Sequence, residues 1–397
     1  MKILFFTYRH WPEVGGVEKY VPRLGHALQE LGHDVRLLTV AHADGLRSRE
    51  VHEGIEIHRF PGHRSSARAW LHLMRKRRLF RWADVIHISD THVLEYFYRM
   101  AAWVFPPKPL FLTRHGMSYQ CPVPELEKYR ARRSLGMVDG VVHDGCFIEK
   151  WLGVKPDCVP DQGLWPEADD LPEVPEPSPD SATFVGRLVP DSGIETYIDA
   201  VALLRNRYNR PIHLHVYGGG SLEASLRERV DREGLPVTFH GWCADAQQRI
   251  TETCFAFIAG RMAMQEAMAR KRLVVAACAS PLKRDYVRGE PFSPYLVSGG
   301  DAESIAEQVD HYAAHADERR RLIATGHAHA RTLSWKRTAA TYLDLWSRPL
   351  PRAPVLCRLG LIGRVRLAWH LWGEARTAER WVRPIEQPPA TAVAPAV

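Results

Sequence analysis

The sequence contains no uninterrupted run of the roughly 18 apolar residues that a membrane-spanning helix requires. Its first residues, MKILFFTYRHWPEVGG, carry one lysine before a short apolar run, which soon reaches arginine, histidine and proline. Such a segment predicts a first β-strand and not a secretory signal peptide. We therefore expect a cytoplasmic protein, with peripheral attachment to the inner face of the cytoplasmic membrane as an open alternative.

Two patterns that would indicate disulfide or metal chemistry are also missing. The seven cysteines form no C-x-x-C pair and no Cys/His cluster with the spacing of a zinc site. No Asp-x-Asp pair occurs, so the sequence offers no obvious carboxylate site for a divalent cation. An odd and scattered set of cysteines is typical of reduced thiols in a cytosol. We predict no disulfide framework and no metal site.

Basic residues are in excess. The formal net charge is +7 and the isoelectric point is near 9.0, which indicates an anionic partner. A nucleotide diphosphate, phospholipid headgroups and nucleic acid all have this property, and charge alone does not distinguish them. Nucleic acid is the least favoured of the three, because the sequence has no recognisable nucleic-acid-binding module.

The 397 residues suffice for two domains of ordinary size. Both halves alternate strand-like apolar runs with helical periodicity, which is typical of a parallel sheet covered by helices. In the first half the strand-like runs are residues 2–8, 35–40, 84–89, 109–115 and 139–144. In the second half they are residues 182–188, 212–220, 237–242, 254–260 and 273–277. The sequence therefore predicts an α/β protein with two similar parallel-sheet domains.

The segment between the halves is rich in proline and acidic residues, and we interpret it as an interdomain linker. After the second half, many arginines stand among leucine, isoleucine and tryptophan. The predicted organisation is an N-terminal parallel-sheet domain at 1–165, the linker at 166–181, a C-terminal parallel-sheet domain at 182–346, a basic amphipathic extension at 347–383 and a disordered tail at 384–397.

Two places in the first half are candidates for ligand binding. Gly15 and Gly16 follow the first predicted strand and open a helix, where glycines let a ligand approach the backbone and free N–H groups can bind an anion. His115 stands at the end of a later strand, at the edge where open parallel sheets bind ligands. The alternatives are a plain β-to-α turn and a histidine with a structural role.

The second half has two further candidates. Arg187 ends the strand in FVGRLVPDSGIETYIDA, where its guanidinium can bind a phosphate through two hydrogen bonds. Glu266 lies on a short predicted helix before a hydrophobic strand, where a carboxylate can accept both hydroxyls of a ribose. The alternatives are a solvated surface arginine and an ordinary helix-surface glutamate.

Together and in this order, the segments resemble glycosyltransferase family 4, the group 1 glycosyltransferases, over residues 1–346. The resemblance rests mainly on WPEVGGVEKYVPRLGHALQELGHDVRLLT, TRHGMSY, GRLVPDSGIETYIDAVALL, VYGGGSLEASL, VTFHGW, QEAMARKRLVVAA and SWKRTAATYLDLW. It implies the GT-B architecture, in which two Rossmann-like domains face each other across a cleft. The N-terminal domain is then the acceptor domain, and the C-terminal domain holds a nucleotide sugar. The resemblance also implies that SWKRTAATYLDLW is the terminal crossover helix of the C-terminal domain.

The resemblance also implies roles for single residues. Arg187 matches the arginine that binds the donor diphosphate, Glu266 the glutamate that binds the ribose, and His115 the histidine near the transferred sugar. We expect these three to be the catalytic residues. We expect the donor contacts to come from Gly15, Gly16, Gly186, Arg187, Gly218, Arg261 and Glu266.

Two positions depart from the family pattern. Ser192 stands where the family has a lysine, which removes one cation from the diphosphate site. Ile258 stands where the family has a glutamate that contacts the donor sugar. We hypothesise that Arg261, in the loop that faces the phosphates in the family, replaces the cation lost at Ser192; an exposed loop arginine is the alternative.

The resemblance implies a metal-independent, retaining hexosyltransferase that uses a UDP- or GDP-linked sugar as co-substrate and needs no cofactor. The acceptor is expected to be a glycan, a lipid-linked sugar or a glycolipid, in the assembly of polysaccharide or lipopolysaccharide. The substitutions at Ser192 and Ile258 keep a second reading open, a degenerate and non-catalytic member that binds a nucleotide sugar, a glycan or a partner enzyme.

A membrane contact is a separate hypothesis. The segment RAWLHLMRKRRLFRW, residues 68–82, places six basic residues among tryptophan, leucine and phenylalanine without an acidic residue, as an interfacial helix would. The arginine- and tryptophan-rich stretch 352–383 is a second candidate. The alternative is a solvated basic face near an anionic acceptor.

Overall fold

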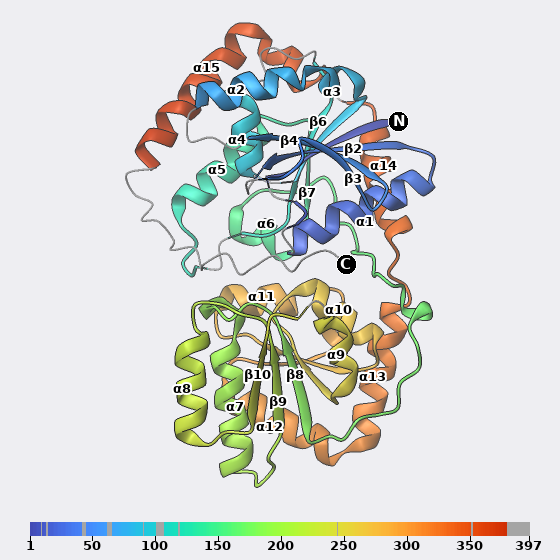
Figure 1. Cartoon of the computed structure of the whole chain (residues 1–397), viewed down its shortest axis with the longest axis vertical. Helices are drawn as coiled ribbons and strands as arrows, with labels where there is room; N and C mark the ends of the chain where they lie inside the picture. Colours follow the sequence, from blue (N-terminus) through green and yellow to red (C-terminus); the bar gives the residue numbers. More distant parts are fainter. Residues whose placement is uncertain are drawn as a thin grey trace. The chain divides into compact units, whose positions relative to one another are not determined.

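The computed structural model shows two compact units (Figure 1). Within the described residues, unit 1 comprises residues 1–161 and 335–378, and unit 2 comprises residues 162–334. The structure describes residues 1–8, 10–12, 15–41, 45–61, 66–89, 91–100, 107–117, 120–243, 245–350 and 352–378. The tail predicted at 384–397 lies outside the described residues, and so does the end of the predicted extension.

Unit 1 is built on a seven-stranded sheet with the order β3-β4-β2-β1-β5-β6-β7. All neighbouring strands are parallel except β3, which pairs antiparallel with β4 at one edge. The strands are β1 (Lys2–Phe6), β2 (Asp34–Ala41), β3 (Arg49–His52), β4 (Ile55–Pro61), β5 (Val85–Ile88), β6 (Leu110–Arg114) and β7 (Gly140–His143). The five strand-like runs of the first half are therefore confirmed, whereas β3 and β4 were not predicted.

Helices cover this sheet and bury its apolar side chains. They are α1 (Gly16–Glu30), α2 (Ser66–Arg75), α3 (Arg77–Trp82), α4 (Thr91–Met100), α5 (Glu125–Leu135), α6 (Phe147–Leu152), α14 (Trp335–Ser347) and α15 (Val355–Ala378). The core of one face joins strand residues such as Phe6 and Ile88 to Phe97 of α4 and Leu356 of α15. Residues near the C-terminus thus complete the core of the N-terminal unit.

Unit 2 has a six-stranded, fully parallel sheet with the order β10-β9-β8-β11-β12-β13. The strands are β8 (Ser181–Val185), β9 (His213–Tyr217), β10 (Val237–Gly241), β11 (Phe255–Phe257), β12 (Leu273–Ala277) and β13 (Val297–Gly299). All five predicted runs of the second half are confirmed, and β13 is an addition. The prediction of an α/β fold with two parallel-sheet domains is therefore correct.

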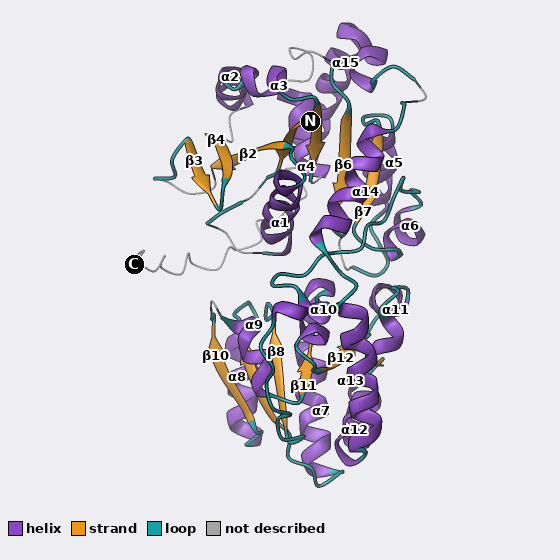
Figure 2. Cartoon of the chain, turned by 90° about the vertical axis from the view of Figure 1, so that its right-hand side faces the viewer, coloured by secondary structure: helices purple, strands orange, loops and turns teal. Residues whose placement is uncertain are grey.

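Helices cover both faces of the second sheet. In Figure 1, α7 and α8 lie on one side of it and α10 and α13 on the other, and Figure 2 shows the same unit turned by 90°. The helices are α7 (Ile194–Asn206), α8 (Glu223–Glu233), α9 (Ala246–Arg249), α10 (Arg261–Ala269), α11 (Pro281–Arg288), α12 (Ala302–Ala314) and α13 (Ala316–Ala330). Phe184, Tyr197 and Phe257 are fully buried in the core between the sheet and α7.

The unit boundaries differ from the predicted domain boundaries. The first unit ends at Asp161 and not at residue 165, so the predicted linker lies within unit 2. Helix α14 belongs to unit 1, although its sequence position placed it in the C-terminal domain. The reason is its apolar and aromatic face: α14 packs against α1, and Tyr342 and Trp346 are almost fully buried in unit 1.

The C-terminal helix α15 is also part of unit 1 and not a separate extension. It packs against α4 and bends at Gly360, whose backbone is non-helical with φ at 58°. Within the described part of the chain, no helix combines the length and the apolar character that crossing a membrane requires.

Candidate functional site

The carboxyl ends of the strands in unit 2 hold most of the predicted donor residues. β8 ends before Gly186 and Arg187, and β9 ends before Gly218. The two turns lie against each other, because Gly186 N donates to Tyr217 O at 3.1 Å and a Cβ at Gly218 would overlap the backbone oxygen of Gly186. Gly218 also has a φ of 140°, which side-chain-bearing residues rarely adopt. The fold therefore requires glycine at this position.

Arg187 extends from this edge into solvent. Its side chain is 77% exposed and lies 4.0 Å from the carboxylate of Asp191, four residues along the chain. An exposed guanidinium at the carboxyl edge of a parallel sheet is available to an anionic ligand. Ser192, which follows Asp191, is buried, and its hydroxyl donates to Val189 O at 2.7 Å.

Glu266 lies on α10, which follows β11, the neighbour of β8 in the sheet. The side chain is 5% exposed. The amide nitrogen of Gln247 on α9 donates to both carboxylate oxygens of Glu266, at 2.9 and 2.7 Å. A carboxylate oriented by a fixed donor can bind two vicinal hydroxyls through its remaining lone pairs.

Arg261 does not have the exposed side chain that the hypothesis about the lost cation requires. It is 6% exposed, and its Nε lies 3.2 Å from Oε2 of the fully buried Glu290. Its backbone N–H donates to the hydroxyl of Tyr286 on α11 at 2.6 Å. Because Glu290 neutralises its charge, Arg261 fixes α10 and α11 to each other and is a poor substitute for a phosphate-binding lysine.

Ile258, where the family has a sugar-binding glutamate, is fully buried. Its backbone N–H donates to Val275 O at 3.1 Å, and its carbonyl is 3.1 Å from the hydroxyl of Tyr197. The side chain therefore belongs to the core, and this position offers no carboxylate to a sugar.

Lys283 is a candidate that the sequence analysis missed. It lies in the first turn of α11, half-buried, with its Nζ 4.9 Å from the ring centroid of Tyr286. Burial lowers the pKa of Lys283 to about 8; the nearby carboxylate of Asp191 opposes this shift, and the charge of Arg187 adds to it. Lys283 is therefore close to the exposed arginine of the strand-end edge.

In unit 1, Gly15 and Gly16 lie at the start of α1, as predicted. A Cβ at Gly16 would meet no atom within 4 Å, and one at Gly15 would contact only the end of the flexible Glu18 side chain. Packing within unit 1 therefore does not require this glycine pair.

His115 follows β6, and Asp144 follows the neighbouring strand β7. His115 Nδ1 lies 3.5 Å from the Asp144 carboxylate, and the ring of Tyr20 contacts the imidazole edge-to-face with centroids 4.7 Å apart. The side chain of His115 is 7% exposed. The imidazole is thus held in a fixed orientation at the carboxyl edge of the sheet, where a ligand would bind.

A buried chain of hydrogen bonds joins α14 to this edge of unit 1. Trp346 Nε1 lies 3.2 Å from His87 Nδ1, His87 Nε2 lies 2.7 Å from Thr113 Oγ1, and that oxygen lies 2.9 Å from the hydroxyl of Tyr342. The Tyr342 hydroxyl lies 3.1 Å from that of Tyr20.

The positions of the protons in these hydrogen bonds follow from which groups are able to donate. Burial, and to a lesser extent the charge of His115, lower the pKa of His87 to about 3, so the ring is neutral. Since the indole of Trp346 can only donate, His87 Nδ1 accepts and Nε2 donates to Thr113. No local pattern predicts this network, because its members come from four separate segments.

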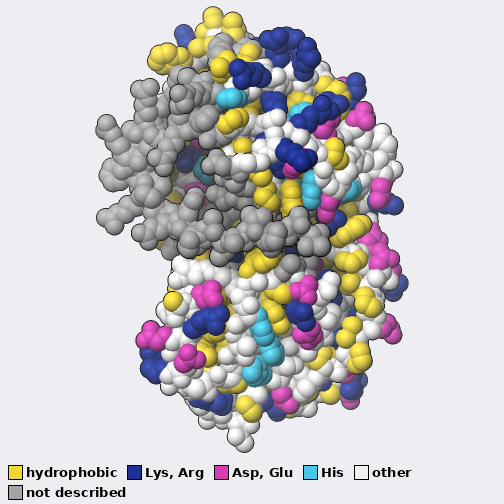
Figure 3. Space-filling view, viewed as in Figure 1, with side chains coloured by type: hydrophobic (Ala, Val, Ile, Leu, Met, Phe, Trp, Pro, Cys, Tyr) yellow, Lys and Arg dark blue, Asp and Glu magenta, His cyan; other side chains and the backbone are white. Residues whose placement is uncertain are grey.

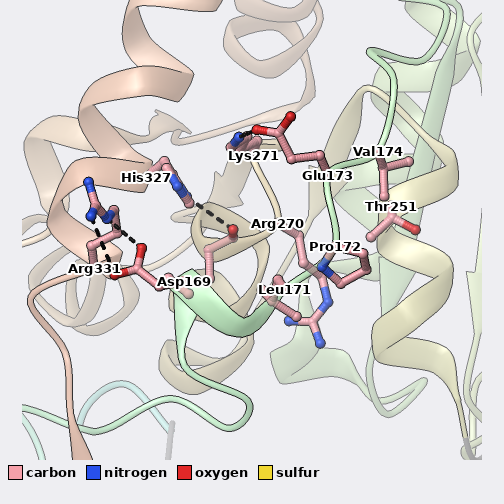
Figure 4. Close-up of a pocket in the computed structure, with 12 residues that line it drawn as sticks. Asp169, Leu171, Pro172, Glu173, Val174, Thr251, Arg270, Lys271, His327 and Arg331 are labelled. Carbon is pink, nitrogen blue, oxygen red and sulfur yellow. Dashed lines mark hydrogen bonds and ion pairs between the residues drawn. The ribbon is translucent and has the colours of Figure 1, made fainter.

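A cavity in unit 2 is lined by residues other than those of the predicted site (Figure 4). Its lining consists of residues 168–169 and 171–174, Thr251, residues 269–271 at the end of α10, and His327 and Arg331 of α13. Asp169 forms an ion pair with Arg331 at 2.5 Å, and Glu173 with Lys271 at 2.9 Å. The acidic linker segment is thus attached to unit 2 by ion pairs, and no predicted site residue lines this cavity.

Two family models match the chain, one in each half. A family model described as Glycosyltransferase Family 4 matches residues 14–143, and one described as Glycosyl transferases group 1 matches residues 179–315. No curated protein matches the chain in sequence.

Solved structures share the fold at low identity. The sucrose-phosphate synthase of Thermosynechococcus elongatus is 17% identical, with 87% of this chain and 98% of that chain covered and a TM-score of 0.67. HepE of Anabaena in complex with UDP is 15% identical, with 87% and 100% covered and a TM-score of 0.68. WaaG, a glycosyltransferase involved in lipopolysaccharide biosynthesis, is 13% identical, with 87% and 100% covered and a TM-score of 0.61.

Proposed function

We propose that this chain, which belongs to the family 4-like, group 1 glycosyltransferases and has the GT-B fold, transfers a hexose from a nucleotide diphosphate sugar to a glycan, lipid-linked or glycolipid acceptor. The observation that supports a donor site most directly is in unit 2. An exposed Arg187 and a buried, amide-oriented Glu266 follow adjacent strands at the carboxyl edge of its parallel sheet. Such an edge is where open α/β sheets bind ligands.

The donor is proposed to be linked to UDP or GDP. HepE of Anabaena, which shares the fold, has been solved with UDP and with UDP-glucose. Two side chains of the site complement two parts of such a donor. The guanidinium of Arg187 can bind the diphosphate, and the carboxylate of Glu266 can accept hydrogen bonds from the ribose hydroxyls. Gly186 and Gly218 keep the turns beside Arg187 narrow, so that backbone amides can approach the phosphates.

The proposed reaction retains the configuration of the sugar and needs no metal. Arg187 and the amides at the strand ends stabilise the negative charge that develops on the leaving diphosphate. To His115, whose Nδ1 lies 3.5 Å from the Asp144 carboxylate, we assign a hydrogen bond to the transferred sugar or to the acceptor. Same-face attack by the acceptor needs no protein nucleophile, so none is assigned.

The direct test is calorimetric titration of the full chain with UDP and with GDP. We expect one of them to bind, and Arg187→Ala to weaken its binding at least about tenfold, the loss of a charge-assisted contact. The thermal midpoint should not change, because the Arg187 side chain is exposed and its ion pair is long. Arg207→Ala, which removes another exposed arginine at the C-terminal end of α7, is the matched control.

A non-catalytic role is the competing proposal, and one observation favours it. The position of Ile258 offers a buried apolar side chain where the family has a carboxylate for the donor sugar. A protein that binds UDP or GDP through Arg187, but neither hydrolyses nor transfers the sugar of any nucleotide sugar offered, would fit this reading. Absence of binding to either nucleotide would contradict both proposals.

We further propose that unit 1 contacts an anionic membrane surface, as an enzyme of polysaccharide or lipopolysaccharide assembly would. Arg75, Arg77, Arg78 and Arg81 of α2 and α3 are exposed, and residues 68–82 contain no acidic side chain. Helices α2 and α15 both pack against α4. Leu361, Ile362 and Trp369 of α15 are 57%, 72% and 71% exposed.

Cationic and apolar side chains thus occur together on this end of unit 1, as Figure 3 shows. Exposed tryptophan and leucine beside arginine are typical of surfaces that bind the headgroup region of anionic lipids. The anionic lipid surface is therefore the occupant that we assign to this patch.

A further inference from the structure

The strand-end edge of unit 2 carries a second cation beside Arg187. In the sheet, β8 and β12 both neighbour β11, so the turns that follow them emerge at the same edge. The turn after β8 contains Arg187 and Asp191, and the turn after β12 leads into α11, on which Lys283 is the third residue. Residues almost one hundred positions apart are thereby brought to one place.

The two turns are held together by packing and hydrogen bonds. The hydroxyl of Tyr197, on the helix that follows Arg187, accepts a hydrogen bond from Ala277 N at the end of β12, at 2.8 Å. A Cβ at Gly193 would lie 2.9 Å from the Cβ of Ala277, so only glycine allows this close approach. The position of the turn after β8 relative to α11 is therefore fixed by the fold.

Lys283 is held within this arrangement. Its backbone N–H donates to the Ser280 hydroxyl at 3.1 Å, which caps α11, and its ammonium faces the ring of Tyr286. Lys283 and Arg187 share the field of the Asp191 carboxylate, so these three groups together carry a net positive charge. A partly desolvated cation pair of this kind gains from an anion with several oxygens.

We propose that Lys283 binds the donor diphosphate together with Arg187 and replaces the cation that the family has at the position of Ser192. This inference rests on the proposed function of the same site. The other candidate for this role, Arg261, is buried against Glu290, whereas Lys283 is half-buried at the edge where Arg187 is exposed. Helix α11 thus supplies the positive charge that is missing at the position of Ser192.

If Lys283 binds the diphosphate, nucleotide binding should be accompanied by a measurable uptake of protons. The pKa of Lys283 is about 8 in the free protein, and a bound diphosphate would raise it, so binding at pH 8 to 9 should take up a proton. The terminal phosphate of the nucleotide is already ionised there, since its pKa is about 6. Among the described residues, Arg187, Asp191 and Cys278 act electrostatically on Lys283, and the ring of Tyr286 lies beside its ammonium. Arg288 and Arg284 act in turn on Cys278. Burial raises the pKa of Cys278, so that thiol stays protonated.

The experiment titrates UDP, GDP and inorganic pyrophosphate into the full chain at pH 8.5, in buffers with different heats of ionisation. Lys283→Met should weaken binding of the nucleotide and of pyrophosphate by about tenfold or more and abolish proton uptake. Lys283→Arg should retain affinity, because it keeps the charge. Arg284→Gln, a neutralisation one residue along the same helix at an exposed position, is the matched control and should bind like the wild type.

The outcomes separate the two proposals. If a nucleotide binds and Arg187→Ala weakens it, but Lys283→Met keeps both affinity and proton uptake, the assignment of Lys283 is wrong and the proposed function stands. If neither nucleotide nor pyrophosphate binds the wild type, the proposed function fails, and this inference with it. Thermal unfolding of Lys283→Met, expected near that of the wild type, shows that a lost affinity is not a lost fold.

Discussion

The side-chain amide of Gln247 lies within 2.9 Å of both carboxylate oxygens of Glu266, and it approaches from a different helix. This contact fixes the orientation of the one acidic side chain that the sequence predicts for ribose binding. Gln247 therefore positions a binding residue without being required to touch the nucleotide itself.

Replacing this donor by an acceptor should weaken nucleotide binding. In Gln247→Glu, a second carboxylate would face Glu266, and the repulsion should displace it or keep one of the two protonated. We expect the affinity for UDP or GDP to fall about tenfold, measured by calorimetry at pH 7. Gln248→Glu places the same charge one residue along, at an exposed position, and should bind normally. Equal affinity of both variants would show that Glu266 needs no orientation by Gln247.

The glycines that follow β9 give a prediction about folding. A Cβ at Gly218 would overlap the carbonyl oxygen of Gly186, whereas a Cβ at Gly219 would meet only the flexible carboxylate of Glu223 at 3.4 Å. We expect Gly218→Ala to lower the free energy of unfolding of unit 2 by about 3 kcal/mol or more, because both backbone overlap and the φ of 140° oppose it.

Gly219→Ala should change that free energy by less than about 1 kcal/mol. Urea denaturation of both variants, followed by far-ultraviolet circular dichroism, distinguishes them. If the two variants were equally stable, the two turns would not be packed as closely as the structure shows.

The sequence predicted most strands of both sheets and the order of the motifs. It did not predict which residues from distant segments lie close together in the fold. Apolar runs such as 35–40 and 273–277 predict buried strands directly, because parallel strands are covered on both faces. β4 was missed, since its sequence IEIHRFP places polar side chains in a strand whose arginine, Arg59, is buried through ion pairing with Glu50. The three-residue β13 is too short to show a pattern.

The candidate site also contains features that the sequence could predict and features that it could not. The positions of Arg187 and Glu266 after strands could be predicted, because each follows an apolar run in a recognisable order. The proximity of Lys283 to the turn after β8, and of Gln247 to Glu266, could not, because it depends on which elements are neighbours in the fold. The burial of Arg261 could not be predicted either, because its partner Glu290 is twenty-nine positions along the chain and no local pattern links the two.

The buried histidines of unit 1 predict a loss of stability in mild acid. The pKa of His87 is lowered to about 3 by burial and by His115, and that of His143 to about 3 by burial and by Arg114, from an ordinary value of 6.5. Between pH 6.5 and 3 the unfolded chain therefore binds protons that the folded chain does not.

The free energy of unfolding should fall as the pH falls through this range, by up to about 1.4 kcal/mol per pH unit for each histidine. His143→Leu should reduce this slope, because in the described structure both ring nitrogens of His143 are buried without a hydrogen-bond partner. Urea denaturation at pH 7 and at pH 5 measures the slope. A variant that loses as much stability as the wild type over this range would exclude His143 as a source of the acid sensitivity.

The exposed apolar side chains of α15 predict a change in membrane binding. Ile362 and Trp369 are 72% and 71% exposed, so replacing both by serine should leave the thermal midpoint unchanged. Binding to vesicles of phosphatidylglycerol and phosphatidylcholine should fall at least about tenfold, because the headgroup region would no longer bury these side chains. Trp242→Ser is the matched control, since Trp242 is 70% exposed but lies in unit 2.

Electrostatic attraction can be separated from apolar insertion in the same sedimentation assay. Neutralising Arg75, Arg77 and Arg78 to glutamine should weaken binding to anionic vesicles and make the remaining binding insensitive to salt. The serine variant, in contrast, should remain salt-sensitive, because its cations are intact. If wild-type binding requires neither the arginines nor Trp369, unit 1 does not contact lipid through this end, and the exposed patch must meet a protein or glycan surface instead.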